Sequence, residues 1–148
     1  MWYTGLIFLH IVFACIWVGG HIVLCFGYLP KALKNKDVSV IQNFESVYEK
    51  IGIPALAGQI ITGVIMFLLR VQDFSNLLNW GDFYGRHFLL KMILLLITLA
   101  LALHARFRII PNLNENNLPL LAVHIILVTI IGILFVLIGL SIRVGLFF

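Results

Sequence analysis

Residues 119–146 read PLLAVHIILVTIIGILFVLIGLSIRVGL and contain one charged side chain, that of Arg143. About 20 consecutive apolar residues suffice for a helix to cross the hydrocarbon core of a bilayer. Three further runs of this kind lie at about 3–28, 51–70 and 87–108. The 148 residues leave no room for an additional soluble domain. The sequence therefore predicts a single all-α membrane domain, an antiparallel bundle of four transmembrane helices.

The composition supports this fold class and excludes others. Hydrophobic residues make up 62% of the chain, charged residues 11%, and the mean hydropathy is +1.11, which no ordinary soluble domain approaches. The net charge of +4 reflects loop Lys and Arg residues and indicates a lipid bilayer as the partner, not nucleic acid. The apolar run that begins at Trp2 is too long for a signal-peptide core and has no cationic segment before it. We expect it to be the first span and not a cleaved signal.

Local signals predict where the spans end. Pro30 is expected to stop the first span, and residues 35–50 are expected to form a short amphipathic helix on the membrane surface. Pro54 is expected in the first turn of the second span, where its missing N–H is tolerated. Trp80 and Tyr84 are expected to anchor the chain at the interface.

Basic residues predict the orientation. Three of them, Arg70, Arg86 and Arg143, belong to one side of the membrane, and twice as many belong to the other: Lys31, Lys34, Lys36, Lys50, Arg106 and Arg108. Because Lys and Arg accumulate on the cytoplasmic side, we expect both termini in the periplasm of a bacterium, with the chain in its inner membrane.

Histidines are the main candidates for function. Four of the five lie within or just inside the predicted spans, at His10, His21, His104 and His124. Titratable side chains in hydrocarbon are costly, so an intramembrane residue of this kind is a functional-site hypothesis by default. His10 and His21 are eleven residues apart, which places them on nearly one helical face about 16 Å apart along the axis. A histidine of this kind also serves in many proteins as a hydrogen-bonding link between helices.

The predicted topology arranges these side chains in two layers. His21, His104 and His124 fall near the inner side, on three different helices. His10 falls in the outer half, where His87 opens the third span. His87 is expected to be interfacial or an iron ligand, and the other imidazoles are expected to face the bundle interior.

Two neutral imidazoles from different helices at one depth are the ligand set of a six-coordinate haem b. We expect at least two of the three inner histidines to bind one metal or haem, and His10 to bind a second haem with His87 or with Lys91. Two haems would give an electron path to a redox partner, a quinone or a protein. Trp17 is expected to stack on a porphyrin or to pack in the core. Lys91 and Arg106 are candidate partners for haem propionates.

Copper is the alternative to haem. Imidazole binds copper well, and thiol or thioether sulfurs select Cu(I). The chain offers such sulfurs at Cys15, Cys25, Met66 and Met92, although the Met residues are not clustered and each Cys reads more simply as a small buried residue.

Several motifs resemble the copper-resistance protein CopD family. They are Leu9-His10 followed by Ile16-Trp17-Val18-Gly19-Gly20, and Lys91 followed by residues 105–113, ARFRIIPNL. The wider superfamily includes HemJ, a haem-binding protoporphyrinogen oxidase of bacteria. The HemJ resemblance implies a membrane oxidoreductase with His10 as iron ligand and Lys91 at the haem site. The chain departs from HemJ because the fourth span lacks an Asn-Glu-Pro type entry and His21 and His124 are additional.

The CopD resemblance implies a haem-binding relative or a protein of copper uptake and resistance. Electron-transferring cytochrome b, copper transporter and porphyrinogen-oxidising enzyme therefore remain three separate hypotheses. Whether the chain forms a homodimer is left open by the sequence.

Overall fold

The protein is all-helical in a computed structural model, which describes residues 1–70 and 81–145. Four of its helical rods are long and apolar enough to cross a membrane, which confirms the predicted fold class. They run through the segments α1 (Trp2–Val23), η1 (Leu24–Tyr28) and α2 (Leu29–Asn35); α3 (Ser39–Arg70); α4 (Phe83–His104), η3 (Ala105–Ile109) and η4 (Ile110–Asn112); and α5 (Leu118–Val144). Trp80 and Leu146, the predicted anchor and the predicted last residue of the fourth span, lie outside the described residues.

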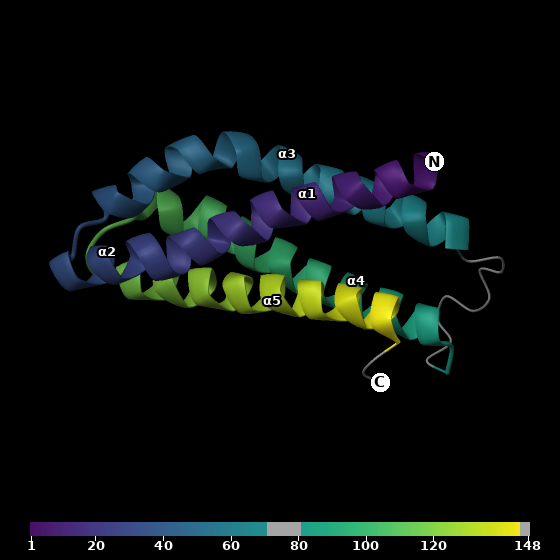
Figure 1. The fold of residues 1–148 in the computed structure, drawn as a ribbon. Coiled ribbons are helices and arrows are strands. Elements are labelled where there is room, and N and C mark those ends of the chain that lie inside the picture. The colour runs from purple at the N-terminus through teal and green to yellow at the C-terminus, as the bar shows by residue number, and fades with distance from the viewer. Residues whose placement is uncertain (71–80, 146–148) are drawn as a thin grey trace.

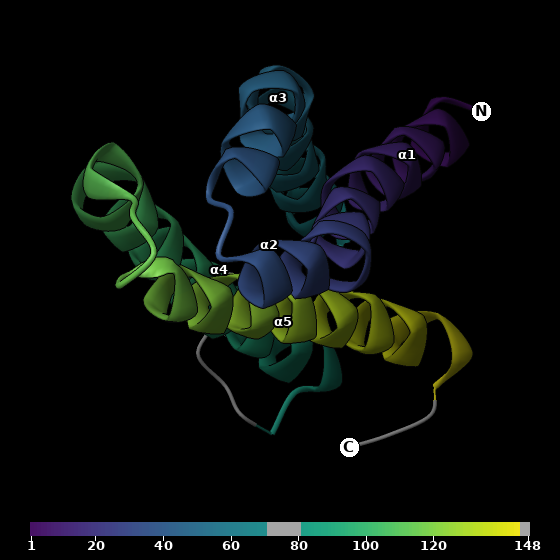
Figure 2. The same ribbon diagram turned by 90° about the vertical axis from the view of Figure 1, so that its left-hand side faces the viewer.

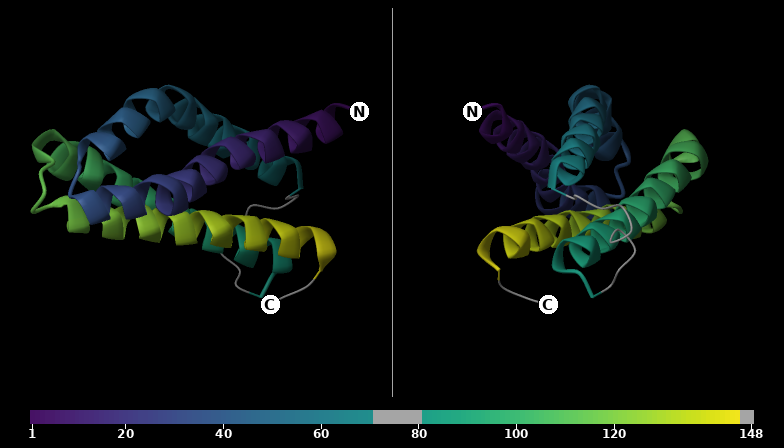
Figure 3. Two further views of the ribbon diagram at one scale, coloured as in Figure 1. Left: turned by 60° about the vertical axis from the view of Figure 1, so that its left-hand side comes forward. Right: turned by 90° about the vertical axis from the view of Figure 1, so that its right-hand side faces the viewer.

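The rods alternate in direction, so the bundle has two distinct ends (Figure 1). The termini end holds Trp2, Arg70, Phe83 and Val144, and the α2 end holds the links 36–38 and 113–117. Seen from the α2 end, α3 lies across the bundle from α5 (Figure 2). Helix α1 crosses α3 obliquely (Figure 3), and α5 packs against both α1 and α4.

The first rod does not stop at Pro30, so that prediction is wrong. A five-residue π-helical turn, Leu24–Tyr28, precedes the proline, and the Leu29 N–H donates to the carbonyl of Leu24. Proline lacks an N–H and its ring clashes with the carbonyl four residues earlier. The wider π turn accommodates both, and the helix continues to Asn35, where Lys36 ends it with a left-handed φ of 53°. A second π-helical turn, Ala105–Ile109, precedes Pro111 in the same way.

Residues 39–70 form one helix, so the separate surface helix and the placement of Pro54 in a first turn are also wrong. Ile41 is only 1% exposed and packs in the core at the α2 end with Phe44. Steps of three and four residues carry this inward face onward through Tyr48, Ala55 and Thr62. One buried face thus runs through the whole of residues 39–70. A break between a surface helix and a membrane span would expose part of that face.

Two groups of buried side chains hold the bundle together. At the α2 end, Leu24, Ile41, Ile109, Leu121 and Ile125 belong to one core cluster, to which all four rods contribute. Further along, α1, α3 and α5 meet around a second cluster of Trp17, Val18, Ala55 and Val128. The histidines near the α2 end thus lie on helices that are held together by a shared core.

The link into α3 is closed by a side-chain cap. The Asp37 carboxylate accepts hydrogen bonds from the backbone N–H of Ser39 at 2.9 Å and from its hydroxyl at 2.6 Å. These bonds stabilise the charged carboxylate and lower the pKa of Asp37. The second rod therefore begins at a defined residue.

Candidate functional site

Two imidazoles from adjacent helices meet near the α2 end. His104 is the last residue of α4, and His124 lies in the second turn of α5. Their Nδ1 and Nε2 atoms, respectively, are 2.8 Å apart, and the rings stack with centroids 5.0 Å apart. His124 is buried, whereas His104 is exposed at the side of the bundle. The sequence predicted that these two residues lie at one depth, and the structure brings them into direct contact.

The hydrogen-bond network assigns the protons of this pair. The Nδ1–H of His124 donates to the carbonyl of Leu120 at 2.9 Å, so Nε2 of His124 is the acceptor nitrogen. It accepts the Nδ1–H of His104. Nε2 of His104 then carries a lone pair and bonds to no other described residue. We refer to these two residues as the imidazole pair.

His21, the third member of the predicted inner layer, does not join the imidazole pair. Its Nδ1–H donates to the carbonyl of Trp17 at 2.9 Å, and its ring lies on the Trp17 indole with centroids 4.7 Å apart. The hydroxyl of Tyr48 donates to the same carbonyl at 2.8 Å. Within the described residues Nε2 of His21 has no partner, so this imidazole is oriented but open on one side.

His10 uses both ring nitrogens on α3. The Thr62 hydroxyl donates to the carbonyl of Gly58 at 2.6 Å and accepts the Nδ1–H of His10 at 2.8 Å. Nε2 of His10 then accepts an N–H of Gln59 at 2.9 Å. Two polar residues of α3, Gln59 and Thr62, thus hydrogen bond to one histidine of α1. As arranged, His10 links two helices and has no free nitrogen for a metal.

His87 is also fully engaged, and it does not stand at the mouth of the span. Helix α4 begins at Phe83, and His87 in its second turn is 0% exposed. Its Nδ1–H donates to the carbonyl of Phe83 at 2.6 Å, and Nε2 pairs with the Ser141 hydroxyl of α5 at 2.9 Å. His10 and His87, the predicted outer pair, thus bond to different helices and not to a shared ligand.

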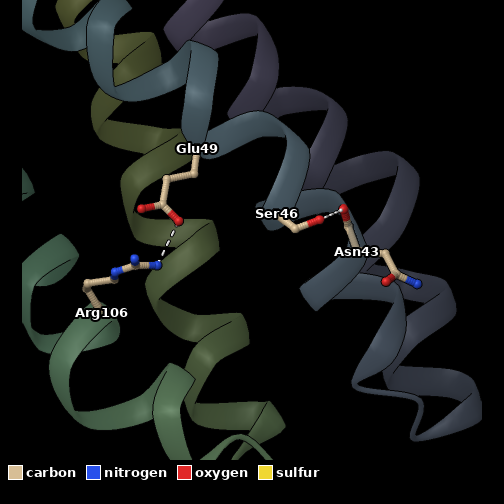
Figure 4. A network of polar contacts seen from close by, with 4 residues as sticks. All are labelled: Asn43, Ser46, Glu49 and Arg106. Carbon is tan, nitrogen blue, oxygen red and sulfur yellow. Dashed lines mark hydrogen bonds and ion pairs between the residues drawn. The ribbon is translucent and has the colours of Figure 1, made fainter.

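The two cationic candidates lie at opposite ends. Lys91 is half-buried on α4 and extends towards α5, where its Nζ would lie 3.5 Å from a Cβ placed on Gly139. Arg106 forms an ion pair with Glu49 of α3 at 2.7 Å (Figure 4), so its charge is already balanced. The same view shows the Ser46 hydroxyl donating to the carbonyl of Asn43 within α3.

The imidazole pair does not fit a haem between its rings. Two axial ligands lie on opposite faces of the porphyrin, each about 2 Å from the metal, which places their nitrogens about 4 Å apart. The pair is joined directly at 2.8 Å with nearly parallel rings. Nor do three His, Cys, Asp or Glu side chains converge on a metal position anywhere in residues 1–70 and 81–145.

Sequence reasoning missed the partners that orient the histidines. Tyr48 lies against Gly20 and Gly52, at both of which an added Cβ would overlap its ring. Gly52 lies four residues after Tyr48 on α3, and Gly20 lies on α1. A glycine four residues from a tyrosine on one helical face is the sequence signal that could have indicated this close packing. Ser141 stands 54 residues from His87, and nothing in the sequence pairs the two.

Comparison with known proteins gives one match. Residues 42–142 match the family described as copper resistance protein D. This range includes α4, most of α3 and α5, and both members of the imidazole pair. Comparison with curated proteins and with solved structures gave no match.

Proposed function

We propose that this chain, which belongs to the copper resistance protein D family, binds a copper ion in the membrane through His104 and His124. One observation carries the proposal: two imidazoles from neighbouring helices place ring nitrogens 2.8 Å from each other. Imidazole is a good ligand for copper. The carbonyl of Leu120 holds His124 in the tautomer that offers Nε2, as backbone carbonyls commonly do for ligand histidines.

Copper binding at the pair would break the hydrogen bond that now joins the two rings. Because the nitrogens are 2.8 Å apart, one ring would have to turn so that both lone pairs reach a metal at about 2 Å. Because the His104 ring is exposed, its side chain has room to turn towards a bound ion. The ligand nitrogens must be unprotonated, so the proton on Nδ1 of His104 would move to Nε2 of the same ring, which stays neutral.

The environment of the imidazole pair favours reversible binding of copper over permanent binding. Closed structural metal sites have a full set of protein ligands, whereas here the described residues supply two, one of them exposed. A site of this kind can accept copper from a carrier and release it again. We therefore favour copper handling over a permanent redox centre.

Haem b, with its electron transfer or porphyrinogen oxidation, is the weaker proposal. Three of the five imidazoles, those of His10, His87 and His124, have both nitrogens engaged. The open nitrogens are those of His21 and His104, and these two side chains make their contacts with different neighbours, Trp17 and Tyr48 for His21 and His124 for His104.

Copper titration tests the proposal. The detergent-purified protein is titrated with Cu(I) against a colorimetric chelator, alongside the variants His104→Ala and His124→Ala. Each variant should lower the affinity by at least about 100-fold, the upper end of what loss of an outer-shell partner causes.

The matched control is His21→Ala, which removes an open imidazole from α1 and should leave the affinity unchanged. Unaltered copper binding in both pair variants would refute the proposal. A low-spin haem b spectrum in the purified protein that disappears in the same two variants would favour haem instead.

A further inference from the structure

Arg70 is held at the termini end by side chains from two other rods. Its Nη1 donates to the hydroxyl of Tyr3 on α1, and its Nη2 to the hydroxyl of Tyr84 on α4, both at 3.2 Å. The guanidinium carbon is also 5.0 Å from the centre of the Tyr84 ring. A long side chain at the end of a helix is thereby fixed in one direction, which an ordinary interfacial arginine is not.

The held guanidinium keeps most of its binding capacity. Arginine has five N–H donors, and two of them are used on the tyrosines. Arg70 is exposed, and no carboxylate among the described residues pairs with it. The described carboxylate at this end, Asp82, accepts the Gly85 N–H at 2.7 Å as the cap of α4. Among residues 1–70 and 81–145, nothing pairs with the three remaining N–H donors of Arg70, whose exposed side chain carries the positive charge.

A surface groove of about 430 Å³ adjoins this guanidinium. It is lined by Trp2, Tyr3, Leu69 and Arg70. Below it, α1 and α3 present exposed apolar side chains to the surroundings, among them Phe8 (65% exposed) and Leu68 (48% exposed). The groove thus joins a cationic, aromatic rim to a surface suited to acyl chains.

We propose that this groove binds the headgroup phosphate of an anionic phospholipid. Arginine recognises phosphate with two parallel N–H donors, and Trp and Tyr side chains favour the depth at which headgroups lie. A lipid is preferred to a free phosphate ion because the apolar faces of α1 and α3 begin directly at the groove. Bound there, the lipid would tie together the ends of α1, α3 and α4.

Native mass spectrometry in neutral detergent tests this site. Phosphatidylglycerol is titrated into wild type and Arg70→Gln, with phosphatidylcholine as the zwitterionic reference. Wild type should bind phosphatidylglycerol about tenfold more tightly than Arg70→Gln does, the ratio expected for about 1.4 kcal/mol of charge-assisted contact. Tyr3→Phe keeps the charge and removes one positioning bond, so it should give a smaller loss.

Arg143→Gln is the matched control, because Arg143 is an exposed arginine in the last turn of α5 at the same end. It should bind the lipid as wild type does. Circular dichroism confirms that each variant is folded. Equal lipid affinity in wild type and Arg70→Gln would overturn the proposal. So would full competition by millimolar inorganic phosphate, which would identify a phosphate-ion site.

Discussion

At the termini half of the bundle, His10 and His87 each use both ring nitrogens on neighbouring groups, with His87 wholly buried. At the α2 half, His21 and His104 each anchor one nitrogen and leave Nε2 without a partner among the described residues. Both π-helical turns also lie in the α2 half, shortly after these two histidines. Single π turns within α-helices are frequent at functional sites.

This difference between the two halves separates two roles of histidine, a residue that is costly to bury in a membrane. Burial of a polar ring in a membrane is tolerated when each nitrogen finds a partner, and such a ring then links helices, as His10 links α1 to α3. An imidazole with one nitrogen fixed and one open is oriented for a ligand. The partners of each ring are therefore a better guide to function here than depth in the membrane: His124, although both its nitrogens are engaged, bonds to another histidine and to a backbone carbonyl of its own helix.

The largest expected effect concerns which compartment each half faces. The excess of Lys and Arg at the α2 end predicts that this end is cytoplasmic. Alkaline phosphatase fused after Phe148 should be active, and a fluorescent protein at the same position should be dark. Fusions within residues 113–117 should give the opposite result. The reverse pattern in both sets of fusions would place the α2 end, with His21 and His104, on the periplasmic side of the membrane.

The next effect concerns stability. His87→Ala should leave a cavity and remove the bond to Ser141, lowering the free energy of unfolding by about 2–4 kcal/mol. His104→Ala removes an exposed ring but leaves the buried Nε2 of His124 unpaired, and should lower it by about 1 kcal/mol. Thermal unfolding in detergent measures both variants. Equal losses would show that the two halves do not use histidine differently.

The sequence supports the spans and the depth of each histidine, because apolar run length and helix direction determine both. It does not reveal how each helix is rotated, and rotation decides that His104 meets His124 while His21 meets Tyr48. The ends of the rods were predicted less well. Pro30 and Pro54 are strong helix breakers locally, but a π turn in one case and a continuous buried face in the other outweigh that preference.

Two adjacent glycines provide a smaller and sharper test of the packing beside His21. A Cβ at Gly20 would overlap the Tyr48 ring, whereas a Cβ at Gly19 would meet nothing within 4 Å. Gly20→Ala should destabilise the protein by about 1–2 kcal/mol, since the ring must move and its bond to the Trp17 carbonyl weakens. Gly19→Ala should be neutral or stabilise by up to about 1 kcal/mol through helix propensity. Unfolding measurements on both variants should therefore differ in sign, and matching values would mean that Tyr48 is not seated between the helices.

The smallest expected effect is that of the ion pair between Glu49 and Arg106, which connects α3 to the third rod in the α2 half. The two side chains are 35% and 51% exposed, so solvent screens their attraction, and a pair of this kind contributes about 0.2–1 kcal/mol. A double-mutant cycle with Glu49→Gln and Arg106→Gln should give a coupling energy in that range, falling as salt is raised. If the charges of this pair act on the copper site, Arg106→Gln would strengthen copper binding and Glu49→Gln would weaken it, because a guanidinium repels a copper cation. Equal, small effects of the two variants on copper affinity are expected, because the charge of Arg106 is balanced by Glu49 and a copper cation gains nothing from a nearby guanidinium.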